Sequence, residues 1–214
     1  MNIRPATFSD IEEMLALKSQ LRFTEQDGTS TKGGFLLGTD AAGYRNRIAQ
    51  QLTWVIDDNG IKGFSIVLPD QALRASEIWS RRHQIEWTID PTHIETSTLG
   101  YYDQLAVLPG PWRSFVPILT IVNVLDFLKT KPNYLISSTV RKPVTNLAAV
   151  PYLKILGGQQ VGIIDEFDSS IGQLVSDIWL ISLKDMEAFL YTNPSKKIAT
   201  FVDNAKNILK KHKE

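Results

Sequence analysis

The sequence contains no cysteine. This absence excludes disulfide bonds, thiolate zinc sites, thiol nucleophiles and iron–sulfur clusters, and it is typical of proteins from a reducing compartment. The sequence also lacks an apolar run of the roughly 18 residues that a membrane helix needs. Its first five residues do not have the layout of a signal peptide. We therefore expect a cytoplasmic protein that has no membrane partner.

A surplus of one charge is also missing, because 23 basic residues balance 23 acidic residues. Proteins that bind DNA or RNA need a clustered cationic surplus, so we expect no nucleic-acid partner. There is no P-loop and no dinucleotide-binding glycine motif. His83 and His93 do not have the spacing of metal ligands, so we expect no metal site.

The overall composition is that of a globular protein. The chain has 214 residues, of which 43% are hydrophobic, and this length favours one domain. Apolar residues at helical spacing predict helices over residues 9–20 and from residue 40. Asn59-Gly60 separates two strand-like segments, 53–57 and 61–68, and is typical of a type I′ hairpin turn.

The rest of the chain also contains both helix-like and strand-like segments. We predict helices over residues 70–87, 114–129 and 145–156, and strands over residues 2–6, 101–108, 133–140, 159–164 and 177–183. This order indicates an α/β or α+β domain with a mixed sheet. From Asn193-Pro194 onward, apolar residues at helical spacing predict a final helix. That helix either docks on its own domain or provides a surface for a homodimer or another partner.

Several short motifs, in this order, resemble the GNAT acyltransferase superfamily. They are the opening from Ile3 to Ile11, the hairpin that ends in Gly63-Phe64, the run from Leu105 to Pro109, and Asn146-x-x-Ala149 followed by Gly157. Members of this family move an acyl group from coenzyme A to an amine. The resemblance covers nearly all of residues 1–183, but no single motif carries it alone.

The resemblance implies a fold and a domain arrangement. We expect a mixed, mostly antiparallel, twisted sheet of six to seven strands flanked by helices, with an extra C-terminal helix. The GNAT-like domain would cover residues 1–183, with an insert at about 70–100. Residues 184–214 would form a helical extension packed on the same domain.

The expected cofactor site begins where the strand 101–108 leads into the helix from Ser114. A helix N-terminus presents unpaired amides and a partial positive charge, which suit a phosphate. By resemblance, the pantetheine arm of acetyl-CoA would lie in a gap between the fourth and fifth strands. The expected cofactor-binding residues are Leu105, Val107, Arg113, Ser114, Phe115, Val116, Ile118 and Asn146.

This cofactor motif is degenerate. Val116 and Ile118 occupy the two positions where the family has small residues, and Pro117 between them has no amide hydrogen. The extra residue at Gly110-Pro111 would shift the loop. The alternatives are an ordinary helix start with a solvated arginine, and an Asn146 that caps a helix instead of binding the cofactor.

The resemblance also implies an acid, and direct attack requires a base. The family's acid is a tyrosine seven residues after Asn146, where this chain has Leu153, so the candidate is Tyr152. A base must take a proton from the substrate ammonium. Asp103 is the best-placed carboxylate, with Glu86 and Glu95 as alternatives. Tyr152 could instead belong to the core, and Asp103 could have a structural role.

Aromatic and basic residues are interleaved between residues 79 and 87. This segment lies between the third and fourth strands, where an insert could border the acceptor pocket. We expect Trp79, Arg82 and Trp87 to bind the substrate. The alternative is an amphipathic helix packed on the sheet.

These expectations lead to one function and one alternative. We expect an acyl-CoA-dependent N-acyltransferase that moves acetyl from acetyl-CoA to a small-molecule or peptide amine by direct attack. The alternative is a GNAT-fold binding or regulatory module that has lost catalysis, which the replaced glycines and the displaced tyrosine favour.

Overall fold

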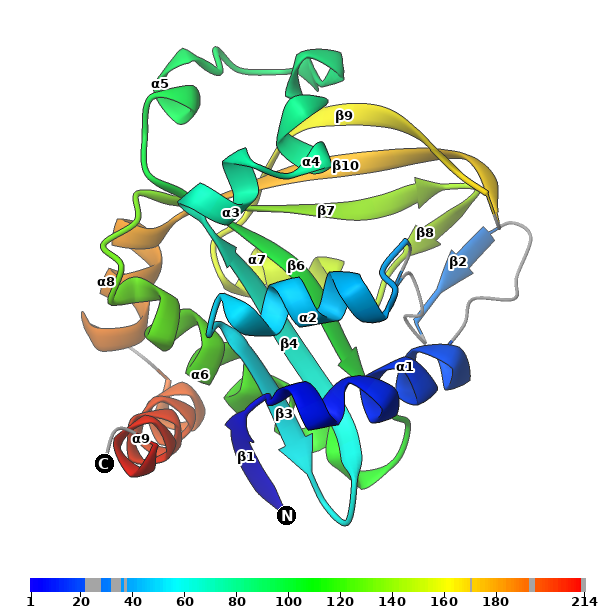
Figure 1. Cartoon of the computed structure of the whole chain (residues 1–214). Coiled ribbons are helices and arrows are strands. Elements are labelled where there is room, and N and C mark those ends of the chain that lie inside the picture. Colours follow the sequence, from blue (N-terminus) through cyan, green and yellow to red (C-terminus); the bar gives the residue numbers. More distant parts are fainter. Residues whose placement is uncertain (22–27, 32–35, 37, 170, 193–194, 213–214) are drawn as a thin grey trace.

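The computed structural model describes all residues except 22–27, 32–35, 37, 170, 193–194 and 213–214. Its centre is a mixed sheet with the strand order β1-β3-β4-β6-β7-β10-β9-β5 (Figure 1). The strands are β1 (Asn2–Pro5), β3 (Thr53–Asp57), β4 (Ile61–Pro69), β5 (Glu86–Trp87), β6 (Leu99–Val107), β7 (Tyr134–Lys142), β9 (Gln159–Asp168) and β10 (Gly172–Ser182). Neighbours pair antiparallel except β6 and β7, which pair parallel. The predicted mixed, mostly antiparallel sheet is confirmed.

Within the described residues this sheet has eight strands, where the sequence predicted six to seven. The additional strand is β5, which pairs with β9 at the sheet edge. It lies in the segment predicted to be one helix over residues 70–87. That segment instead contains α3 (Asp70–Arg74), α4 (Glu77–Ser80) and a 3₁₀ turn (Arg82–Gln84). The helix breaks at Ser76, because its hydroxyl accepts a hydrogen bond from the Trp79 amide at 3.3 Å and so starts a new helix.

Helices cover both faces of the sheet (Figure 1). The first face carries α1 (Ile11–Gln20), α2 (Ala41–Ala49), α3 and α5 (Thr92–Glu95), whose apolar residues share one core cluster. The second face carries α6 (Val116–Leu128), α7 (Val150–Ile155), α8 (Leu183–Thr192) and α9 (Lys196–Lys211), which share the other cluster. No helix in the described ranges combines the length and the apolar character that crossing a membrane requires.

The predicted helix over residues 145–156 is partly wrong. Its first residues form β8 (Val144–Asn146), which pairs parallel with β2 (Gly28–Ser30) in a small second sheet. Only α7 is helical. Pro151 explains the late start, because proline lacks an amide hydrogen and fits only the first turn of a helix.

The C-terminal segment packs on the second face. Val202, Ala205 and Leu209 of α9 are buried in the same cluster as α6. Ser195 caps this helix by accepting from the Ile198 amide at 3.3 Å. The predicted start at Asn193-Pro194 lies outside the described residues.

Candidate active site

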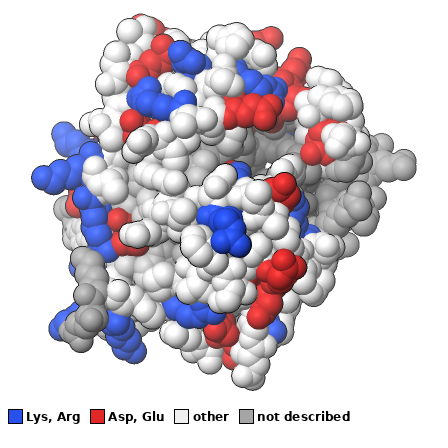
Figure 2. Space-filling model, in the orientation of Figure 1, with Lys and Arg blue, Asp and Glu red and all other residues white. Residues whose placement is uncertain are grey.

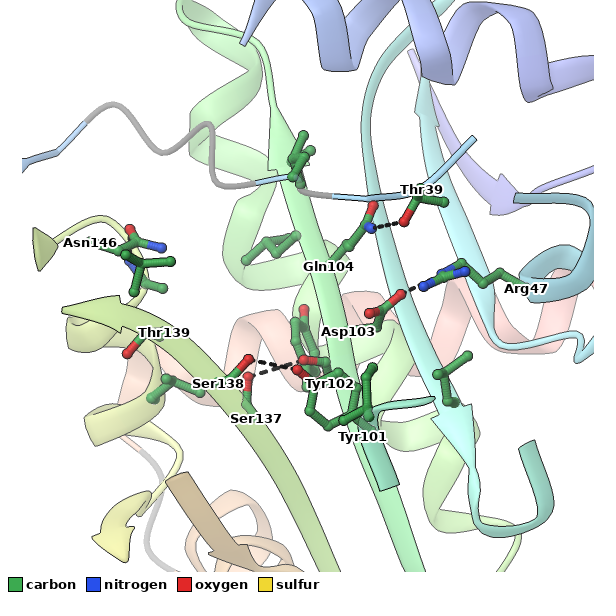
Figure 3. A pocket seen from close by; sticks show the side chains of 18 of the residues that line it. Thr39, Arg47, Tyr101, Tyr102, Asp103, Gln104, Ser137, Ser138, Thr139 and Asn146 are labelled. Atoms are coloured by element: carbon green, nitrogen blue, oxygen red, sulfur yellow. Dashed lines mark hydrogen bonds and ion pairs between the residues drawn. The ribbon is translucent and has the colours of Figure 1, made fainter. Parts of the chain in front are cut away.

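Strands β6 and β7 are paired over only part of their length. Their register covers Leu99 to Tyr102 against Tyr134 to Ser137. Beyond this point β6 continues to Val107 beside β4, and β7 continues to Lys142 beside β10. The two strands therefore diverge, and among the described residues no strand pairs with the edges that face each other (Figure 3). At the apex of this wedge the Ser137 hydroxyl donates to the Tyr102 carbonyl at 3.0 Å.

A cleft of about 820 Å³ occupies the wedge. On the second face its walls include Arg113, Val116 and Tyr152, and on the first face they include Arg47 of α2 and Glu77 of α4. Figure 2 shows that the first face is hollowed above α2, with acidic and basic side chains interspersed around the hollow. The cleft thus reaches both faces of the sheet, and its volume is that of a typical ligand site.

A β-bulge shapes the β6 wall. The register steps from Ile66 opposite Gln104 to Val67 opposite Tyr102, so Asp103 has no partner in β4. In a regular strand, consecutive side chains point to opposite faces, and a bulge interrupts this alternation. Asp103 and Gln104 consequently both point toward the first face.

Side chains around α2 hold these two residues (Figure 3). Gln104 donates to the Thr39 hydroxyl at 2.8 Å and accepts from the Tyr44 hydroxyl at 3.0 Å. The Asp103 carboxylate forms an ion pair with Arg47, whose Nε lies 2.5 Å from its Oδ2. The Asp103 side chain is only 7% exposed. These contacts fix the polar wall of the cleft.

The buried tyrosines of the site are hydrogen-bonding groups. Burial, and secondarily the Asp103 charge, raises the pKa of both Tyr44 and Tyr101. Burial also raises the pKa of Tyr102, whose hydroxyl lies 2.9 Å from the Ser65 hydroxyl. The hydroxyls of Tyr101 and Ser138 are 2.6 Å apart. All three phenols therefore remain protonated at neutral pH.

Seven of the predicted site residues line the cleft together: Asp103, Leu105, Val107, Arg113, Val116, Asn146 and Tyr152. The side chains of three predicted cofactor residues lie outside its walls. The Ser114 hydroxyl donates to the Pro111 carbonyl at 2.6 Å, and Phe115 and Ile118 pack against the core.

The predicted α-helix start at Ser114 is wrong by two residues. A 3₁₀ turn (Pro111–Phe115) comes first, and α6 begins at Val116. Gly110 enters the turn with φ of 108°, a value that favours glycine. Within the turn the Arg113 amide donates to Gly110, and the Val116 amide donates to Arg113. The backbone amides of Arg113 and Val116 were expected to face a phosphate, but both are hydrogen-bonded within the turn.

Asn146 and Tyr152 lie on the opposite wall. The Asn146 side-chain oxygen accepts from the amides of Ala148 and Ala149 at 3.2 and 3.3 Å. Asn146 therefore caps the turn into α7 while lining the cleft. Tyr152 and Leu153 both line the cleft. The tyrosine therefore lies in the cleft wall even though it is one residue before the position expected from the family motif.

The aromatic and basic cluster borders a different space. Trp79, Arg82 and Trp87 line a neighbouring cavity of about 190 Å³ and do not line the main cleft. The Arg82 guanidinium lies 5.2 Å from the centre of the Trp79 ring and donates to Glu95 at 3.1 Å. Glu86 and Glu95, the alternative bases, lie outside both cavities.

The polar residues of the cleft wall that sequence reasoning missed include Arg47, Gln104, Ser138 and Glu166. The run of hydroxyl residues at 137–139, inside a predicted strand, was a usable signal of a strand beside a polar space. Glu166 was missed because the strand was predicted to end at residue 164, whereas β9 continues to Asp168. Arg47 had no distinguishing pattern in the sequence.

Comparisons with known proteins identify the fold. No family model matches the chain, and no curated protein matches it. Naa20 from Chaetomium thermophilum in complex with a bisubstrate analogue is 12% identical over 92% of this chain and 93% of that chain, with a TM-score of 0.59. A ribosomal-protein-alanine N-acetyltransferase from Brucella melitensis is 15% identical over 85% and 99%, with a TM-score of 0.55. A chain of the NatC complex bound to Gag peptide and CoA is 14% identical over 85% and 99%, with a TM-score of 0.56.

These comparisons place the chain in the α/β fold class shared by these N-acetyltransferase structures. The chain has the GNAT fold, as the sequence motifs predicted.

Proposed function

We propose that this chain is an acyl-CoA-dependent N-acyltransferase that transfers an acyl group, with acetyl as the simplest case, to a primary amine. The diverging edge of β6 carries this proposal. Its amides and carbonyls face a cleft that reaches both faces of the sheet, so they are available to the amide groups of a pantetheine arm. Leu105 and Val107 form one wall beside the arm, and Val140 forms the other.

The chemistry is direct attack. The substrate ammonium first gives one proton to the base. The amine nitrogen then forms a bond to the thioester carbonyl carbon, the carbon–sulfur bond breaks, the nitrogen loses a second proton, and the departing thiolate gains one. Backbone amides of β6 stabilise the developing oxyanion. Tyr152, on the α7 wall, protonates the departing thiolate.

Two carboxylates in the cleft are candidates for the amine proton. Asp103 is held by Arg47 at 2.5 Å, whereas Glu166 lies 3.6 Å from Arg81. Proton transfer to Asp103 would weaken its close ion pair, so we assign the base to Glu166. Asp103 then has a positioning role, because its ion pair with Arg47 holds β6 against α2.

Binding of the CoA phosphates relies on Arg113 and the start of α6. The 3₁₀ turn uses two amides, and Pro117 has none, so this site offers fewer donors than a glycine-rich loop. The same observation favours a second candidate function, a GNAT-fold binding or regulatory module without turnover.

A binding test separates these outcomes. Acetyl-CoA at about 100 times its Kd should raise the melting temperature by about 5 °C or more. Val140 is buried in the cleft wall and belongs to neither core cluster, so Val140→Trp should fill the wedge and abolish the shift. Phe167→Trp, at a side chain 73% exposed, is the matched control that should keep it.

A turnover test follows. A thiol reagent detects the CoA that is released, and the protein itself adds no background because it contains no cysteine. Release of CoA with an amine panel supports the enzyme, and binding without release favours the regulatory module. No stabilisation by any acyl-CoA, with an unliganded melting curve that shows a folded protein, overturns the proposal.

A further inference from the structure

A second cavity adjoins the cleft on the first face of the sheet. Its volume is about 190 Å³. It shares with the cleft the wall residues Glu77, Ile78, Tyr101, Ser138 and Glu166. A molecule in the cleft can therefore extend a group into this side cavity.

The walls of the side cavity are largely apolar and include Leu73, Trp79, Trp87, Ile136, Ile164 and Ile178. Leu73 and the three isoleucines are buried parts of the core, so they form a fixed surface. The guanidinium groups of Arg74 and Arg82 lie 4.9 and 5.2 Å from the centre of the Trp79 ring and hold this aromatic wall. An apolar cavity of about 150 Å³ binds benzene in a well-studied case. The side cavity thus suits an apolar group of this size.

The junction between the cavities is polar. Ser138 is the first residue of β7 beyond its last pairing with β6, so the junction lies at the apex of the wedge. The Tyr101 and Ser138 hydroxyls meet there, and the carboxylates of Glu77 and Glu166 come from two different elements. Arg81 donates separately to the Asp165 carbonyl at 2.9 Å, so its position does not depend on Glu166. Arg81 and Arg82 line the same cavity, where Arg81 lies 3.6 Å from Glu166 and Arg82 pairs with Glu95 at 3.1 Å. At the junction the carboxylates of Glu77 and Glu166 therefore exceed the charge of Arg81, which favours a cation with an apolar substituent.

We propose that the acceptor is a primary amine that carries a benzene-sized apolar group close to its nitrogen. The apolar group occupies the side cavity, and the ammonium lies at Glu166. This inference rests on the proposed function for its role in transfer, but the binding itself is measurable without CoA. A small amine and the N-terminal residue of a peptide both have this chemistry.

Matched amines test the binding. Tryptophan fluorescence, which includes the cavity residues Trp79 and Trp87, reports titrations without CoA. The pairs are 2-phenylethylamine with ethanolamine, phenylalaninamide with serinamide, and Phe-Gly-Gly with Ser-Gly-Gly. We expect the aromatic member to bind at least tenfold more tightly. Equal binding within every pair overturns the inference. Binding of the tripeptide identifies a peptide acceptor, and binding of only the smaller amines identifies a small-molecule acceptor.

Variants locate the binding. Ile85 also lines the side cavity. Ile85→Trp should fill this cavity and remove the preference, and Ile85→Phe is a smaller change if the first variant does not fold. Ile89→Trp is the matched control, because Ile89 lies on the same segment and lines neither cavity. Glu166→Gln should weaken both members of each pair. An unchanged preference in a folded Ile85 variant overturns the inference.

Turnover separates this inference from the proposed function. CoA release without a preference for apolar amines overturns the inference alone. Preferential binding of apolar amines without any CoA release supports the side cavity and overturns the transferase.

Discussion

The Oδ2 atom of Asp103 lies 2.5 Å from the Nε atom of Arg47, so an ion pair joins strand β6 to helix α2 beside the cleft. The two side chains are 7% and 20% exposed. Arg47 also donates to the Gly43 carbonyl at 3.3 Å, which fixes its direction. The β6 wall of the cleft is thus held by a charge pair that has little contact with water.

Removing both partners of this pair should cost less stability than the sum of the two single removals. Arg47→Gln leaves the Asp103 carboxylate buried and unpaired, which should cost about 1–3 kcal/mol of unfolding free energy. The double variant Arg47→Gln with Asp103→Asn should lose less than the sum of the single variants. Urea unfolding of the four proteins measures the difference. Effects that add to within about 0.5 kcal/mol would show that the pair contributes no coupling.

Glu166→Gln should impair catalysis without impairing cofactor binding. Loss of a general base typically reduces kcat/KM by about 10²–10⁴-fold. The shift in melting temperature with acetyl-CoA should stay unchanged, because Glu166 lies on the acceptor side. Asp103→Asn should have a smaller effect on kcat/KM. CoA release measured across pH tests both variants, and a larger loss in Asp103→Asn would reverse the assignment.

Gly100→Ala should destabilise the contact between β6 and α6. A Cβ atom at this position would lie 2.0 Å from the Phe127 ring. Overpacking of this kind costs about 1–3 kcal/mol or more. Phe127→Leu in the same chain should recover part of the loss by making room. Thermal unfolding of both single variants and the double variant tests this, and a double variant less stable than Gly100→Ala would contradict it.

The Arg4–Asp10 ion pair predicts a pH dependence of stability. Burial alone would raise the pKa of Asp10. Hydrogen bonds from Arg4 at 2.8 and 2.9 Å, and from the Thr7 amide at 2.7 Å, outweigh it and lower the pKa below its usual 3.8. The stabilisation is therefore present above pH 3.8 and is lost as the pH falls through the folded-state pKa.

Asp10→Asn tests this dependence. The variant should be less stable than the wild type at neutral pH, and the difference should shrink as the pH falls below about 4. Urea unfolding at several pH values measures the difference. A difference that stays constant down to about pH 2 would contradict it.

Local chemistry explains which elements the sequence predicted well. The Asn59-Gly60 hairpin, the helix α1 and the start of α2 were predicted to within two residues, because turn geometry and apolar spacing are local properties. The short β8 strand was missed because its pairing with β2 depends on a distant segment. The breaks in residues 70–87 depend on the Ser76 cap, which a composition pattern does not reveal.

The same division between local and distant information applies to the candidate site. Tyr152 could be found because motif spacing places it near the expected cleft, and Asp103 because it is a carboxylate on the strand that faces this cleft. Arg47 and Glu166 could not, because they come from elements far away in the sequence, and only the packed sheet brings them to β6. The bulge that turns Asp103 toward Arg47 is also a property of strand pairing, which the β6 sequence alone does not specify.

That bulge makes position 103 an inserted residue in an otherwise regular strand, because Asp103 and Gln104 both lie on the first face. Deletion of Asp103 would make Tyr102 and Gln104 neighbours, and their side chains already point to opposite faces, as in a regular pleat. Tyr102 would keep its place beside Ser65 and Gln104 its place beside Thr39, while Arg47 would lose its partner. A deletion at another position of β6 would instead move every side chain beyond it to the other face. A change in the length of β6 should therefore be tolerated best at position 103.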